Sequence, residues 1–410
     1  MCDGIEMPGV DLEEILQAER IRTLFQPIIS LKQKRMVGVE ALSRGERACN
    51  GGLLPPALLF SVAAQAGCTL ALDRLCRKVA LTSFNGLAQR DDLLLFLNID
   101  PGILTEGVAG SGHLHDQMAA MGLSPSRVAI EIVESRVESQ ELLLNFARFY
   151  RQLGCLIVLD DFGDDQSNFG RVAMLRPDII KVSRSLVDGI AYDYYRQSVM
   201  TAIVSLADKI GSLVLAEGVE RFEDIMTCHE LGADLMQGFF FSHPKLPGEI
   251  ASASCCKEKI DSVFMAMRSR LVGNYTRRMR RKEAVNAVLT KVLDGLIPLP
   301  LSSFDELLIK VVPECEEVEC VYVLDKDGIQ ISDTVFRQPP MPRNSLFAPA
   351  EKGAEHQLKS YYFAVAYSDM GHFCSEPYLS HASGNLCRTV STVFSGIDSC
   401  RYILCVDIQS

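Results

Sequence analysis

The chain has 410 residues, a formal net charge of −11 and 48% hydrophobic residues. This length predicts two or three domains, unless a barrel of about 250 residues takes one share. The composition is that of a folded globular protein and excludes a mainly disordered chain. The acidic balance argues against a general binder of DNA or of membrane surfaces, because those ligands attract a basic face.

Targeting signals are not evident. No stretch approaches the roughly 18 uncharged apolar residues of a membrane helix, and the start, MCDGIEMPGVDLEE, lacks the basic and apolar parts of a signal peptide. We therefore expect a cytoplasmic protein without membrane insertion. The fourteen cysteines form no C-x-x-C pair, so reduced, mostly buried thiols are expected rather than a zinc or redox site.

Up to about residue 250, short apolar runs alternate with helical patterns, which is typical of a parallel sheet with helical crossovers. Eight strands are expected: TLFQPIIS (23–30), MVGVEALSR (36–44), LFLNI (95–99), RVAIEIVE (127–134), CLIVLDDFG (155–163), PDIIKVS (177–183), SLVLAEGVE (212–220) and LMQGFFFS (235–242). Eight strands in about 240 residues predict a (β/α)8 barrel. Only LKQKR separates the first two, too short for a crossover, so they should pair as an antiparallel hairpin.

Beyond the barrel, residues 251–298 predict a helical linker and residues 299–410 an α+β domain. The linker has apolar residues at helical spacing, Val263, Met267, Leu271, Val285, Leu289 and Val292, and a basic cluster that we interpret as a solvated helix face. In the last domain a short helix, SSFDELLIKVV, precedes expected strands at 319–332, 361–368, 384–394 and 400–408, with Asp327-Gly328 as a hairpin turn.

The ends of the barrel strands carry polar residues. These are Glu40, Asn98, Glu131, Asp160, Asp161, Lys181, Glu217 and Gln237. Since the carboxyl ends of parallel barrel strands meet at one mouth, these side chains should converge. Clustered carboxylates cannot all stay ionised without cations, and an oxygen-rich set without histidine favours Mg²⁺ or Mn²⁺. Two such ions are a known device for phosphodiester hydrolysis, with Glu217 as a candidate general base.

This ordered series resembles the EAL domain family, the phosphodiesterases of the second messenger cyclic di-GMP. The resemblance covers about residues 20–245 and rests on Gln26-Pro27-Ile28, Glu40-Ala41-Leu42 with Arg44, Asn98, Glu131-x-x-Glu134, Asp160-Asp161-Phe162-Gly163, Lys181, Glu217-Gly218-Val219-Glu220 and Gln237-Gly238. It implies a modified TIM barrel with an antiparallel first strand, and hydrolysis of cyclic di-GMP to the linear dinucleotide pGpG.

The resemblance also implies roles for individual residues. Glu40, Asn98, Glu131 and Asp160 would hold one metal, and Asp160 with Asp161 the second. Lys181 and Glu217 would be catalytic, with Glu217 as the base. The substrate would meet Gln26, Arg44, Gln237 and Glu220, while Glu134 would anchor the loop after Asp161.

Three departures from the family pattern leave an alternative open. Active members usually have a Thr-Gly-Tyr-Ser-Ser-like loop where this chain has Asp164-Asp165-Gln166-Ser167-Asn168, an Asp where it has Ser183, and commonly a Ser where it has Asp100. Because small misplacements cost large factors in rate, a catalytically weak or inactive cyclic di-GMP receptor is the alternative to an active enzyme. The third hypothesis is a protein-interaction scaffold that neither binds nor hydrolyses cyclic di-GMP.

The whole arrangement, an EAL barrel, a linking helix and a small α/β domain, resembles the YkuI type of EAL protein, whose C-terminal domain is PAS-like. This implies a regulatory domain that binds an unknown small ligand or a protein, and a homodimer. The sequence leaves the ligand and the direction of regulation open. The lone histidines of this domain, His356, His372 and His381, are expected to be structural rather than haem or metal ligands.

Overall fold

The structure is a computed structural model, and it describes residues 11–47, 51–87, 90–99, 112–133, 140–164, 169–250, 254–339, 348–368 and 370–409. The chain divides into two compact units, Met1–Ser269 and Arg270–Ser410. This division falls inside one long helix. The domain boundaries expected at 250 and 298 stay predictions.

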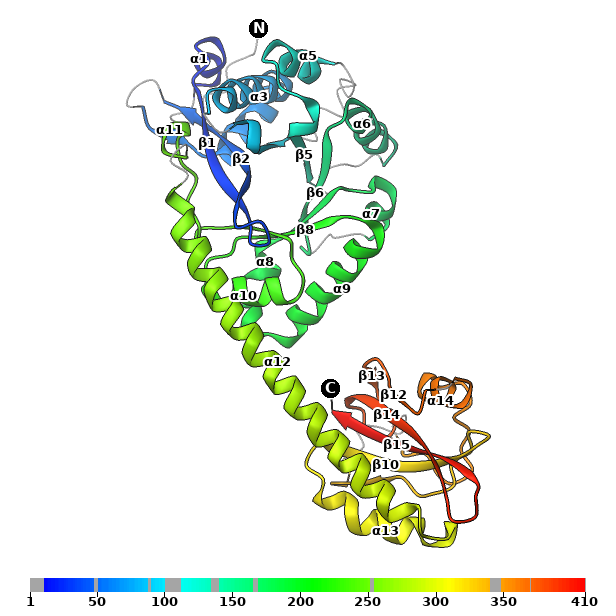
Figure 1. The fold of residues 1–410 in the computed structure, drawn as a ribbon. Coiled ribbons are helices and arrows are strands. Elements are labelled where there is room, and N and C mark those ends of the chain that lie inside the picture. The colour runs from blue at the N-terminus through cyan, green and yellow to red at the C-terminus, as the bar shows by residue number, and fades with distance from the viewer. Residues whose placement is uncertain are drawn as a thin grey trace. The chain divides into compact units, whose positions relative to one another are not determined.

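The first unit is built around a closed barrel of eight strands (Figure 1). They are β1 (Ile21–Ser30), β2 (Arg35–Glu46), β4 (Leu94–Asn98), β5 (Val128–Val133), β6 (Leu156–Phe162), β7 (Ile179–Val182), β8 (Leu213–Glu217) and β9 (Leu235–Gln237). A short β3 (Leu53–Leu54) is added beside β2. The expected modified TIM barrel is confirmed.

The first strand runs against both of its neighbours. β1 pairs antiparallel with β2 and with β9, whereas the pairs from β2–β4 round to β8–β9 are parallel. A four-residue turn over 31–34 joins β1 to β2, and this length allows a hairpin but no crossover. The register places Gln26 opposite Glu40, so both arms of the hairpin deliver a polar residue to one level of the barrel.

Helices cover the outside of the barrel (Figure 1). They are α1 (Leu12–Gln17), α2 (Pro56–Gln65), α3 (Thr69–Asn85), α5 (His113–Ala120), α6 (Gln140–Leu153), α7 (Phe169–Leu175), α8 (Arg184–Val187), α9 (Tyr194–Ile210), α10 (Phe222–Glu230) and α11 (Pro247–Ile250). Apolar residues on the outer faces of the strands form one buried cluster with most of these helices, while α1, α2 and the start of α3 form a second cluster with Ile21 and Leu54. This packing encloses the strands, as alternating strands and helices predict.

The last barrel strand is shorter than the sequence predicts. β9 ends at Gln237, whereas the apolar run continues to Ser242. The backbone of Gly238 lies against Val219, where a Cβ atom would come 2.0 Å from the Val219 carbonyl oxygen. The chain then turns, with Phe240 N donating to Val219 O at 3.1 Å. Only glycine permits this close approach, and the approach ends the strand.

A 43-residue helix, α12 (Ser254–Leu296), follows the barrel. At its start Val263 and Met267 are buried in the core of the first unit. Towards its end Val285, Leu289 and Val292 are buried in the core of the second unit. Leu271, between them, is 57% exposed and belongs to neither of these cores.

The second unit contains an antiparallel sheet in the order β11-β10-β15-β14-β12, with β13 paired to β14. The strands are β10 (Val318–Asp325), β11 (Val335–Phe336), β12 (His372–Cys374), β13 (Tyr378–Leu379), β14 (Leu386–Ser395) and β15 (Arg401–Gln409), and α13 (Phe304–Val311) and the end of α12 pack on one face. After β10 the chain reverses at Asp327-Gly328, with a bridge between Leu324 and Gln330. The expected C-terminal α+β domain is present.

One element of this unit differs in type from the prediction. Residues 361–368, expected as a strand, lie in helix α14 (Ser360–Ala366) and the turn after it. Tyr361, Tyr362 and Val365 are buried against the other face of the sheet, and their spacing suits one side of a helix. The aromatic and β-branched composition favoured a strand, but contact with the sheet determines the outcome.

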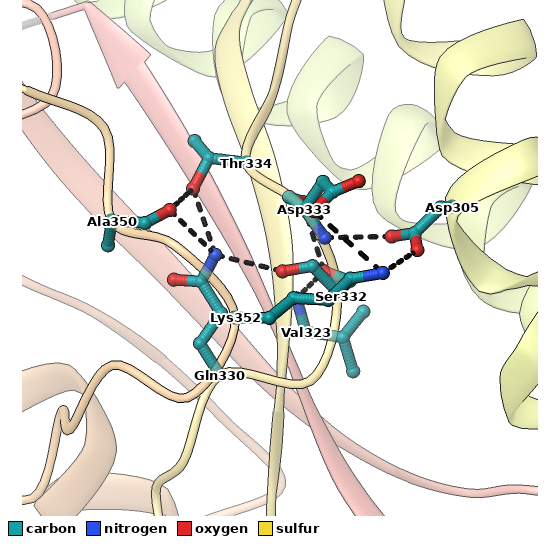
Figure 2. Close-up of polar contacts among 8 residues, drawn as sticks. All are labelled: Asp305, Val323, Gln330, Ser332, Asp333, Thr334, Ala350 and Lys352. Atoms are coloured by element: carbon teal, nitrogen blue, oxygen red, sulfur yellow. Dashed lines mark hydrogen bonds and ion pairs between the residues drawn. The ribbon is translucent and has the colours of Figure 1, made fainter.

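Polar contacts tie α13 to the chain that follows β10 (Figure 2). The Asp305 carboxylate accepts a hydrogen bond from Asp333 N at 2.7 Å and one from the Lys352 ammonium. Beside it, Gln330 Nε2 donates to Ser332 O and Thr334 Oγ1, both at 2.9 Å. These bonds satisfy backbone groups of the irregular segment that follows β10.

The histidines and thiols mostly follow expectation. His356 is buried and lies between Tyr361 Oη at 2.9 Å and Gln330 Oε1 at 3.1 Å, a structural role. Burial lowers its pKa to about 4. Among the described cysteines, Cys374 and Cys400 are exposed free thiols, and buried free thiols are Cys76, Cys155, Cys228, Cys256, Cys315, Cys320, Cys387 and Cys405. Cys68 is disulfide-bonded, so the expectation of reduced thiols is wrong for this residue. No helix in the described part of the chain is long and apolar enough to span a membrane.

Candidate metal and substrate site

The inside of the barrel is arranged in two levels. The lower level is apolar and takes one buried residue from each barrel strand: Ile28, Val37, Phe96, Ala129, Val158, Ile179, Leu215 and Leu235. Side chains two residues apart on a strand point to the same face. On six strands, therefore, the residue two positions later also points inward, and these six are Asn98, Glu131, Asp160, Lys181, Glu217 and Gln237.

The hairpin completes this polar level. Glu40 comes from β2, and Gln26 comes from β1, which runs in the opposite sense. Asn98 Nδ2 donates to Glu40 Oε1 at 2.8 Å, and Gln237 Nε2 donates to Glu40 Oε2 at 2.5 Å and to Gln26 Oε1 at 3.2 Å. Gln26 Nε2 in turn donates to Ser242 O at 3.3 Å. The amides of Asn98 and Gln237 thus each hold one oxygen of Glu40, and Gln26 holds Gln237 in turn.

Lys181 lies at the centre of the carboxylates. Its Nζ atom is 2.9 Å from Glu131 Oε1, 3.1 Å from Asp160 Oδ1, 3.6 Å from Glu40 Oε2 and 3.9 Å from Glu217 Oε2. The Lys181 side chain is 1% exposed. Burial alone would favour the neutral amine, yet the surrounding carboxylates raise the pKa of Lys181 well above its usual value. The ammonium is therefore a fixed positive charge in the site.

The carboxylates respond differently to this environment. Burial, together with Glu40, raises the pKa of Glu131 well above its usual range. Burial also opposes ionisation of Glu40, but Lys181 and the hydrogen bonds of Gln237 and Asn98 outweigh it, so the pKa of Glu40 is lowered. At the rim, burial raises the pKa of Glu217 to about 7 against the attraction of Lys181.

Asp160, Asp161 and Glu217 form a group that could hold a metal ion, since one oxygen of each lies within 4.8 Å of the others. Lys181 contacts four carboxylates, and Asp161 adds a fifth to the group, so a single ammonium cannot balance the charge that these groups carry when all are ionised. Glu131 Oε2 and Gln237 Oε1 are buried and make no hydrogen bond to the described residues. An oxygen-rich set with such atoms fits hard divalent cations such as Mg²⁺ or Mn²⁺.

The remaining expected site residues lie further from this group. Arg44 is half-buried on β2, where loss of hydration lowers its pKa and Glu40 opposes the change. Glu220 pairs with Arg184 at 3.0 Å. Glu134 lies outside the described residues. Ser242, whose carbonyl oxygen accepts from Gln26, also takes part in holding the site, and no pattern in the sequence pointed to it.

Comparison with known proteins identifies the barrel. The EAL domain family model matches residues 10–244. The chain is 25% identical over 334 residues to YkuI of Bacillus subtilis, covering 80% of each chain, and 27% identical over 239 residues to the probable cyclic di-GMP phosphodiesterase PdeB of Escherichia coli, covering 58% of this chain and 45% of PdeB. The chain therefore spans less than half of PdeB, and only 31% of one relative from Azorhizobium caulinodans.

Two solved structures are similar in fold to this chain. A crystal structure of B. subtilis YkuI in complex with cyclic di-GMP and calcium covers 98% of this chain and 99% of its own, with a TM-score of 0.79 and 23% identity. A manganese and cyclic di-GMP complex of BlrP1 from Klebsiella pneumoniae covers 59% of this chain and 58% of its own, with a TM-score of 0.51 and 29% identity. The matched family model spans more than half of the chain, and the chain belongs to the EAL domain family.

Proposed function

We propose that the chain is a metal-dependent phosphodiesterase that hydrolyses cyclic di-GMP to the linear dinucleotide pGpG. One observation carries the proposal: five carboxylates and one ammonium meet at a single barrel mouth, on the family's motif positions. The relatives PdeB and PdeI of E. coli are described as probable cyclic di-GMP phosphodiesterases. The solved structures of YkuI and BlrP1 are complexes with the dinucleotide and with calcium and manganese, respectively.

The residues at the barrel mouth have different proposed roles. Glu40, Asn98, Glu131, Asp160 and Asp161 would hold two ions, which we propose to be Mg²⁺ or Mn²⁺. Such ions polarise a phosphoryl oxygen and lower the pKa of a water molecule. The hydrogen bond from Asn98 Nδ2 to Glu40 turns the amide so that its oxygen is the atom available to a cation. The amide of Gln237, which also donates to Gln26, keeps Glu40 in one orientation.

Glu217 is the proposed general base. It is the least buried carboxylate contacting Lys181, and a pKa near 7 suits a group that takes a proton at neutral pH. The proton of the attacking water would pass to Glu217 as the new P–O bond forms and the bond to the 3′ oxygen breaks, and the 3′ oxygen would take a proton from solvent to become the hydroxyl of pGpG. Arg44 can donate two parallel hydrogen bonds to a phosphate, and we place it, with Glu220, in substrate binding.

The test is hydrolysis by the purified full chain with Mg²⁺ or Mn²⁺, with the nucleotides separated by chromatography. We expect pGpG to accumulate, and Glu217→Gln to slow it at least about 10²-fold, the usual contribution of a general base. Glu223→Gln, an exposed glutamate of α10, is the control. If the dinucleotide stayed intact with Mg²⁺ and also with Mn²⁺, the result would contradict the proposed hydrolysis.

The second candidate function is a cyclic di-GMP receptor with little turnover. The observation that favours it is the changed chemistry after Asp161, where Asp164 and Ser183 replace the usual residues. Tight calorimetric binding of the dinucleotide with no pGpG would support the receptor. We further propose that the chain acts in the cytoplasm as a homodimer, and that the second unit is a PAS-like regulatory domain for a small ligand or a protein.

A further inference from the structure

The backbone around Asp161 is unusual. Asp161 has a φ of +56° and Gly163 a φ of +108°, and the pairing of β6 with β7 shifts register between Leu159 and Phe162. An aspartate in the left-handed region is uncommon and persists only where its surroundings hold it. Asp161 is one of the carboxylates that could hold a metal, so what holds it bears directly on the site.

The backbone provides part of the support. Phe162, 1% exposed, is anchored in the core, and Ser183 N donates to Phe162 O at 2.9 Å. Asp164 N donates to Asp161 O at 3.4 Å and closes a turn. This bond is long, so the turn needs a further restraint.

The restraint comes from a chain of side-chain hydrogen bonds. Ser185 Oγ donates to Asp164 Oδ1, and Ser183 Oγ lies 2.8 Å from Ser185 Oγ. A hydroxyl has one proton to donate, and that of Ser185 goes to Asp164. Ser183 must therefore donate to Ser185, and the bonds run from Ser183 through Ser185 to the Asp164 carboxylate.

The Ser183 end of this chain of hydrogen bonds is fixed. Ser183 is 2% exposed, lies two residues after Lys181 on the β7 side, and precedes α8 without capping it through its side chain. A Cβ atom at Gly163 would lie 3.5 Å from Ser183 Oγ, so this serine also packs against the turn at Gly163. The Ser183 hydroxyl, which could have capped α8, donates a hydrogen bond to Ser185 instead.

We propose that Asp164 is a positioning residue for Asp161, acting through Ser185 and Ser183. Its carboxylate ties the turn after β6 to the start of α8 and keeps Asp161 in the orientation that a second divalent ion needs. In this hydrogen-bond chain, Asp164 supplies the carboxylate and Ser183 supplies the hydroxyl at the other end. The inference rests on the proposed function, because it assigns Asp161 to a metal.

The test measures metal binding rather than turnover. Mn²⁺ is titrated into the full chain by calorimetry for the wild type and for Asp164→Ala, Ser185→Ala and the double variant. The matched controls are Asp208→Ala and Ser198→Ala, an exposed aspartate and an exposed helix serine of α9. The conservative variant Asp164→Asn keeps an oxygen that can accept from Ser185.

We expect Asp164→Ala and Ser185→Ala each to weaken Mn²⁺ binding about 10-fold, the lower end for partners that orient metal ligands. The double variant should be no weaker than either, because both changes break one contact. Asp164→Asn should restore binding, which a general loss of stability would not explain. Thermal unfolding of the metal-free variants should match the controls.

Two results would overturn the inference. Metal binding by both single variants equal to that of the controls would show that Asp164 does not position Asp161. Should Asp164→Ala fail to fold, Ser185→Ala alone decides, since it leaves the carboxylate in place. If the wild type itself bound no Mn²⁺, the proposed function would fail, and this inference with it.

Discussion

Replacing Lys181 by methionine perturbs the centre of the site most directly. The substitution keeps the length of the side chain and removes the charge from among Glu131, Asp160, Glu40 and Glu217, at 2.9 to 3.9 Å. Each contact of about 4 Å is worth roughly 4 kcal/mol at an effective dielectric constant near 20. Removing one partner of a buried pair costs about 3–5 kcal/mol, since the other charge stays buried.

The carboxylates can partly compensate by taking up protons. The pKa of Glu131 is already raised, so we expect the lower value, about 3 kcal/mol, in metal-free buffer. For a unit of this size that corresponds to an unfolding temperature about 6–12 °C lower. Added Mn²⁺ should restore part of the loss, because cations replace the missing positive charge.

The assay is thermal unfolding followed by circular dichroism, with a chelator and then with Mn²⁺. Lys209→Met, which removes an exposed lysine at the end of α9, is the matched control. If Lys181→Met unfolded at the same temperature as this control in the chelator, the ammonium would not be holding the carboxylates together.

Three further predictions concern other parts of the chain. Burial raises the pKa of Asp407 to about 6; its stabilising contribution is therefore present below pH 3.8 and lost as the pH rises through 6. Asp407→Asn should stabilise the second unit by up to about 3 kcal/mol at pH 8 and by little near pH 4, as urea unfolding at both pH values would show. Gly238→Ala should destabilise the barrel by about 3 kcal/mol, because its Cβ atom would meet the Val219 backbone; Gly248→Ala, with open space around it, is the control in the same assay. Saturating Mn²⁺, at about 100 times its dissociation constant, should stabilise the wild type by about 2.7 kcal/mol, and an unchanged unfolding temperature after chelation would contradict this.

The polar level of the site could be predicted because it depends on the two-residue period of a strand. An apolar residue that points into the barrel, such as Val158, fixes the direction of the residue two positions later, Asp160. The eight strands and the antiparallel hairpin followed in the same way, from periodicity and from the length of the connection.

Contacts between residues far apart in the sequence could not be predicted from such local patterns. The end of β9 depends on Gly238 meeting Val219, and the bond from Ser185 to Asp164 joins residues 21 positions apart. The segment at 361–368 has the composition of a strand, but its tyrosines pack on a sheet as a helix. In each case tertiary packing, which a local pattern does not contain, decides the result.

The claim that divalent ions occupy the barrel mouth is tested most directly by counting them. Electron paramagnetic resonance of the full chain titrated with Mn²⁺ reports free and bound ions separately. We predict two bound ions per chain in the wild type and weakened binding of both in Asp160→Asn, since Asp160 is the proposed bridge. A wild-type chain that is folded and binds no Mn²⁺ would contradict the account.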